Sequence, residues 1–190
     1  MVAATERPRA SALSASLAGI EGGLLGACWM LLWLGVSAKW QQRSFWTSAN
    51  LMASVFYGSS SIHSGFAWST VAGIALYLFL YGVLGALFVM ALRGRINGKR
   101  TILAGMCFAL AWYYFSFHLL WKVVMPLVAL LHTERPMVLG HLLYGAVLGR
   151  FPVYLNLLEP PPPAEPAEEA ASPDTIEPGQ EQTSPPIEES

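Results

Sequence analysis

The chain has 190 residues, of which 54% are hydrophobic and 12% are charged, whereas a soluble domain carries about 25% charged residues. Its net charge of −1 combines two opposed parts: residues 1–158 carry all 11 Lys and Arg against three acids, and residues 159–190 carry nine acids and no base. This asymmetry is typical of a membrane-embedded body with an acidic tail. A protein that binds nucleic acid requires a solvated basic face, so this asymmetry excludes nucleic acid as a partner. It indicates the lipid bilayer as the partner instead.

The amino-terminal part combines a short basic segment with an apolar run. Residues 1–13 are expected to be a cytoplasmic segment, and residues 14–37 are long enough to cross the hydrocarbon core as a helix. A cleaved signal peptide is the alternative, because residues 36–38 (Val-Ser-Ala) resemble a cleavage site. Glu21 and the bulky Trp29 inside the run favour a retained helix.

The long connection that follows, residues 38–68, is rich in tryptophan. A Thr or Ser at 47–48 can cap a short helix over about 47–57, which ends before Gly58. Its apolar side and the neighbouring Trp residues are typical of a helix that lies in the headgroup region. We therefore predict an interfacial helix here.

Three further spans are predicted, over about 69–92, 101–125 and 136–158. Four basic residues separate the second span from the third, Pro126 ends the third, and Pro136 suits the first turn of the fourth. Seven Lys or Arg then lie on one side of the membrane and four on the other, which predicts that both termini are cytoplasmic. The expected fold is an all-α, antiparallel four-helix transmembrane bundle, residues 14–158.

The last 32 residues, 159–190, contain nine prolines and nine acids. Such a composition cannot bury a core, so a disordered, acidic, Pro-rich tail is expected.

Glycines are spaced in the spans as helix contacts require. In the first span they form two overlapping small-xxx-small pairs, Gly19/Gly23 and Gly22/Gly26, and the fourth span carries Gly145 and Gly149. Glu21 lies on the opposite side of the first helix. The first helix therefore needs protein on both sides: one side meets the bundle, and the other could meet a neighbouring helix or a second copy.

Polar side chains inside hydrocarbon are costly and so normally have a partner or a use. Those in the predicted spans are Glu21, Tyr81, Tyr114, His118, Lys122, His141 and Tyr144. Counting the rise per residue places Tyr81 and Glu21 in the cytoplasmic part, so we expect Tyr81 to donate a hydrogen bond to Glu21. The same counting places His118 and His141 together in the outer third.

Three functions remain open from the sequence. The first is a non-catalytic structural or accessory subunit, with a homo-oligomer and a larger membrane complex both open as its assembly, since the sequence contains no catalytic or metal-binding motif of the common kinds. The second is a small proton-linked permease in which Glu21 takes up and releases a proton. The third is a haem b protein with His118 and His141 as axial ligands, and no other cofactor is predicted.

The run GHLLYGAVLG at Gly140–Gly149 resembles the last-helix signature of small uncharacterised four-span bacterial membrane proteins that carry a His-x-x-Tyr-Gly run. The resemblance covers one span. It implies a bacterial cytoplasmic (inner) membrane location and brings no activity.

Overall fold

The structure, a computed structural model, describes residues 12–92, 99–124, 126–131 and 133–158. Throughout these ranges the regular structure is helical, so the predicted all-α bundle is confirmed. The basic loop at 93–98, most of the amino-terminal segment and the acidic tail at 159–190 lie outside the described residues.

Four helical runs are long and apolar enough to cross a membrane: Ala12–Trp40, Trp68–Leu92, Lys99–Val123 and Glu134–Leu158. The first two are α1 (Ala12–Trp40) and α3 (Trp68–Leu92). The third joins α4 (Lys99–Phe115), a π-helical turn (Ser116–Leu120) and α5 (Trp121–Val124). The fourth joins α7 (Glu134–Leu148) and α8 (Phe151–Leu158). The protein is thus a multi-pass membrane protein.

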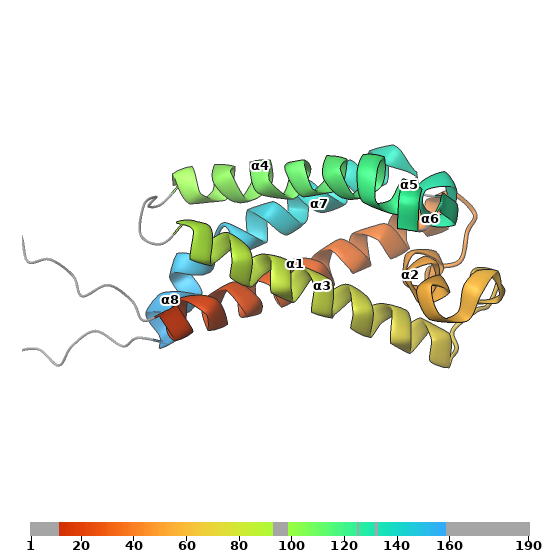
Figure 1. Cartoon of the computed structure of the whole chain (residues 1–190), viewed down its shortest axis with the longest axis horizontal. Coiled ribbons are helices and arrows are strands. Elements are labelled where there is room, and N and C mark those ends of the chain that lie inside the picture. Colours follow the sequence, from red (N-terminus) through yellow and green to blue (C-terminus); the bar gives the residue numbers. More distant parts are fainter. Residues whose placement is uncertain (1–11, 93–98, 125, 132, 159–190) are drawn as a thin grey trace, which may run out of the picture. The chain divides into compact units, whose positions relative to one another are not determined.

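Short elements gather at one end of the four runs (Figure 1). They are α2 (Thr47–Tyr57), a 3-10 turn (Gly58–Ser61), α5 and α6 (Pro126–Leu131). At the opposite end, α8 packs against the start of α1. We call these the α2 end and the α8 end.

The helix predicted at 47–57 is α2, and it packs against α3. Its middle is buried, and the Asn50 side chain donates to the backbone oxygen of Ser64 at 2.7 Å and accepts from the Thr70 hydroxyl at 2.7 Å. Gly73 of α3 makes the packing possible, because a Cβ there would overlap the backbone of Ala49. The α2 helix is therefore held to the bundle by a buried polar side chain as well as by apolar contacts.

Glycines bring the long helices into backbone contact. Gly19 and Gly23 of α1 lie against Gly85 and Tyr81 of α3, where an added Cβ would collide with backbone atoms. In the same way Gly105 of α4 lies against the pair Gly145 and Gly149 in the fourth run. Close approach of this kind increases the van der Waals contacts between membrane helices. These contacts matter because the hydrophobic effect contributes little to helix association inside a bilayer.

These contacts decide which side of α4 faces inward. Its buried residues are Thr101, Gly105, Ala109 and Tyr113. The polar stripe of Tyr114, His118 and Lys122 lies on the exposed side instead. Near the headgroups polar side chains are tolerated toward the outside, so the small residues, rather than the polar ones, set the inward face.

Helix α1 ends in a Schellman motif. The backbone N–H of Arg43 donates to the Ala38 oxygen at 2.9 Å, and that of Gln42 donates to the Lys39 oxygen at 3.0 Å. Gln42 adopts the left-handed conformation that the motif requires, with φ of 58°. The motif ends α1 at the α2 end of the bundle, and Arg43 follows directly after this turn.

Candidate functional site

A cavity of about 50 Å³ lies at the α2 end of the bundle. Its walls are mainly aliphatic and aromatic side chains from α1, α2, α3, the third run and α6, among them Leu34, Met52, Leu80, Trp112, Phe117, Trp121 and Val128. Its polar lining consists of Ser37, Gln41, Arg43, Thr47, Ser48, Thr133 and two tyrosines, Tyr77 and Tyr81. Because a cavity needs about 10–15 Å³ for each water, this space holds only a few waters or a comparably small part of a ligand.

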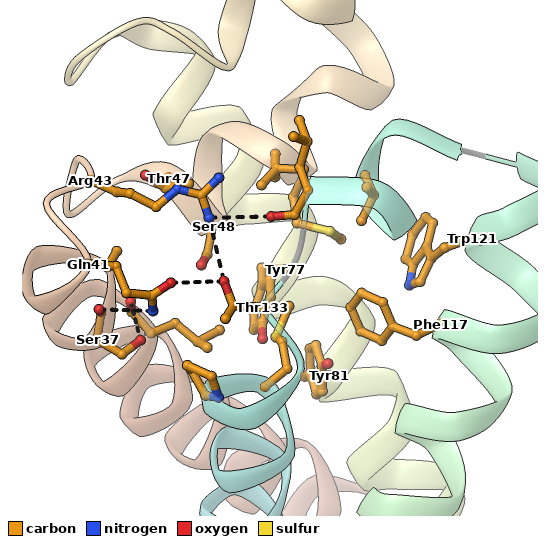
Figure 2. A pocket seen from close by; sticks show the side chains of 18 of the residues that line it. Ser37, Gln41, Arg43, Thr47, Ser48, Tyr77, Tyr81, Phe117, Trp121 and Thr133 are labelled. Atoms are coloured by element: carbon orange, nitrogen blue, oxygen red, sulfur yellow. Dashed lines mark hydrogen bonds between the residues drawn. The ribbon is translucent and has the colours of Figure 1, made fainter.

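The Tyr77 hydroxyl stands out among these groups. Tyr77 is 2% exposed, and its hydroxyl oxygen is a buried side-chain polar atom that has no hydrogen-bond partner among the described residues. Figure 2 shows the Tyr77 side chain among the residues that line the cavity. A buried hydroxyl without a partner is unfavourable by about 1–3 kcal/mol, and this one belongs to a side chain that lines the cavity.

The polar side chains next to Tyr77, those of Tyr81, His141 and Tyr144, form hydrogen bonds within the bundle. The Tyr77 ring stacks on Tyr81 with centroids 4.6 Å apart. The Tyr81 hydroxyl lies 2.8 Å from Nε2 of His141, and Nδ1 of His141 lies 2.8 Å from the Met137 oxygen. Since a carbonyl oxygen only accepts, Nδ1 donates to Met137, and Nε2 accepts from Tyr81. The Tyr144 hydroxyl closes the cluster by donating to the backbone carbonyl oxygen of Tyr81 at 2.8 Å.

This cluster corrects the expected hydrogen bond from Tyr81 to Glu21. Tyr81 points into the bundle and pairs with His141, whereas Glu21 is exposed on the far side of α1. Counting the rise along each helix misjudged the depth, because a long helical side chain points back toward the helix amino terminus. For Tyr81 that direction leads to the α2 end, where His141 lies.

The mouth of the cavity carries a fixed positive charge. Nη1 of Arg43 donates to the Leu131 oxygen at 3.3 Å and, more weakly, to the Thr133 hydroxyl at 3.5 Å. Thr133 in turn donates to the side-chain oxygen of Gln41 at 3.0 Å, and Gln41 donates to the Ser37 oxygen at 3.1 Å. These bonds are drawn in Figure 2. Both acceptors of the guanidinium are neutral groups, so these bonds leave its positive charge uncompensated and able to pair with an anion.

The remaining site candidates from the sequence lie apart from the cavity. Glu21 is on the exposed side of α1, and Tyr114, His118 and Lys122 are exposed on α4. The structure does not bring His118 and His141 together around an open space: the ring of Tyr113 packs against both, with centroid distances of 6.3 Å and 5.1 Å. Gly22 and Gly26 of α1 lie against the Tyr154 and Tyr144 side chains.

Two residues that line the cavity, Tyr77 and Arg43, were not among the site candidates from the sequence. Tyr77 lies one turn from Tyr81, but nothing in the sequence marks it as the unpaired member of the two. Arg43 lies in a connection that reads as an outer loop, and it follows directly after the turn that ends α1 at the α2 end of the bundle. No family model, curated protein sequence or solved structure matches this chain.

Proposed function

We propose that this protein is a non-catalytic accessory subunit of a membrane complex. It binds one small amphipathic anion in the cavity at the α2 end. The observation that carries the proposal is the Tyr77 hydroxyl, which is buried without a hydrogen-bond partner on a side chain that lines the cavity, as Arg43 also does. A ligand with an acceptor for the Tyr77 hydroxyl and an acidic group for the Arg43 guanidinium would give the first a hydrogen-bond partner and the second a counter-charge.

The chemistry of the lining supports binding rather than catalysis. Most of the wall is apolar, and a few placed donors fix orientation, as is usual for small-molecule sites. The small volume limits the enclosed part of the ligand to a few atoms, so the rest of it would lie at the mouth. We infer a small organic acid with an apolar middle and a second oxygen at its inner end.

We further propose that the protein lies in a bacterial cytoplasmic membrane with both termini in the cytoplasm. The count of basic residues on the two sides supports this orientation. It places the mouth of the cavity on the outer face of the membrane, and a ligand would enter from there or from the outer leaflet.

Native mass spectrometry of protein extracted gently from its membrane tests the binding proposal. Wild type should carry a small acidic adduct, and Tyr77→Phe and Arg43→Gln should lose it. The matched control is Tyr114→Phe, which removes the hydroxyl of an exposed tyrosine and should retain the adduct. A wild-type protein that shows only its bare mass, or an adduct that survives both cavity substitutions, would contradict the proposal.

A further inference from the structure

Glu21 is a carboxylate on the exposed side of a membrane helix. It lies nine residues into α1, about 14 Å from the start at 1.5 Å per residue. The side of α1 that packs inside the bundle carries the glycines, and Glu21 lies away from it between exposed Leu17 and Leu25. Among the described residues no ion pair or hydrogen bond reaches this carboxylate. A carboxylate at such a depth normally faces protein.

A positive charge of the same chain lies at the same level. Helices α1 and α7 run antiparallel, with Gly26 against Tyr144 and Gly22 against Leu148. Continuing this register by two residues places Arg150 opposite Ile20, and so within one residue, about 1.5 Å of helix rise, of the level of Glu21. Arg150 is exposed, in the turn between α7 and α8.

Glu21 and Arg150 do not meet within one copy. Gly22 and Gly26 mark the side of α1 that touches α7, and Tyr144 and Leu148 mark the side of α7 that touches α1. At 100° per residue, Glu21 and Arg150 are each turned well away from that contact. Each side chain therefore projects outward from the surface that α1 and α7 share.

We propose that a second copy of this chain docks on the outer surface of α1 and α7, so that Glu21 of each copy pairs with Arg150 of the other. A two-fold axis along the membrane normal keeps every residue at its own depth, so two groups that are level in one copy are level across the interface. Each copy supplies one acid and one base, and both pairs form at once. Around them the surface is apolar, with exposed Leu25, Trp29 and Leu32 on α1 and exposed Leu139 on α7.

The charge pattern favours a second copy over an unrelated helix, because this chain already presents both members of the pair at matching depth. An unrelated partner would have to supply a base for Glu21 and a separate acid for Arg150. The inference does not depend on the cavity or its ligand, which lie at the other end of the bundle.

Charge exchange between two tagged copies tests the interface. The copies are co-expressed with different tags, extracted in native lipid discs, and scored by co-capture. Glu21→Arg alone presents only bases at the interface and Arg150→Glu alone only acids, so each variant should co-capture itself at least tenfold less than wild type does. A Glu21→Arg copy mixed with an Arg150→Glu copy regains both pairs and should be captured at close to the wild-type level. Lys122→Glu, which changes an exposed base on α4, should leave co-capture unchanged.

Three results would overturn the proposal. They are a wild type that is monomeric in the discs, single variants that associate with themselves as well as wild type does, and a mixed pair captured no better than either variant alone. If a reversed charge prevents insertion into the membrane, the experiment uses Glu21→Gln and Arg150→Gln in place of the charge-reversal variants. Each of these neutral variants should then lower self-capture several-fold, and unchanged self-capture would also overturn the proposal.

Discussion

At the scale of single residues, the most informative position is Tyr77. In protein stripped of ligand, Tyr77→Phe removes a buried hydroxyl that has no partner and should raise the free energy of unfolding by about 1 kcal/mol. Tyr144→Phe removes a hydroxyl that donates to the backbone oxygen of Tyr81 and should lower the free energy of unfolding by about as much. Thermal unfolding of the two variants in the same detergent measures both, and a destabilised Tyr77→Phe would show that this hydroxyl is already satisfied by the chain.

Gln42 offers a second prediction at this scale. A left-handed φ is unfavourable for residues with a Cβ and not for glycine. Gln42→Gly should therefore stabilise the protein by about 0.5–1 kcal/mol, while Gln42→Ala, which keeps a Cβ, should not. Equal melting temperatures for the Gly and Ala variants would argue against the Schellman ending of α1.

At the scale of elements, the contact between α1 and α3 depends on glycine. A side chain at Gly85 would overlap the backbone oxygen of Gly19, so Gly85→Leu should force the two helices apart and destabilise the bundle by about 3 kcal/mol or more. Gly65→Ala adds a methyl group where no atom lies within 4 Å and serves as the control. A Gly85→Leu protein that melts with wild type would contradict the close contact.

The same contacts show what the sequence could and could not reveal about the fold. Apolar length predicted four long apolar helices, because the length of an apolar run is a property of a single helix. The inward face of α4 was not predictable in this way, since it depends on where Gly105 meets Gly145 on another helix. The cavity was missed for a related reason: Tyr77, Arg43 and Thr133 come from three separate parts of the chain and meet only after packing.

At the scale of the whole molecule, the orientation in the membrane is open to a direct test. In a chain with Cys28 and Cys107 replaced by Ser, a cysteine at exposed Ser59 should react with a membrane-impermeant maleimide in intact cells. A cysteine at Ser190 should react only after lysis, because both termini are predicted to be cytoplasmic. The reverse pattern of labelling would move the cavity mouth to the cytoplasmic face.

The central claim is that the cavity is built for a ligand. An experimental density map of the protein in native lipid tests this most directly. We expect density for a small molecule inside the cavity, with one of its polar atoms about 2.7–3.0 Å from the Tyr77 hydroxyl and an acidic group at Arg43. A cavity that is empty, or that holds only water bonded to Tyr77, would contradict the account.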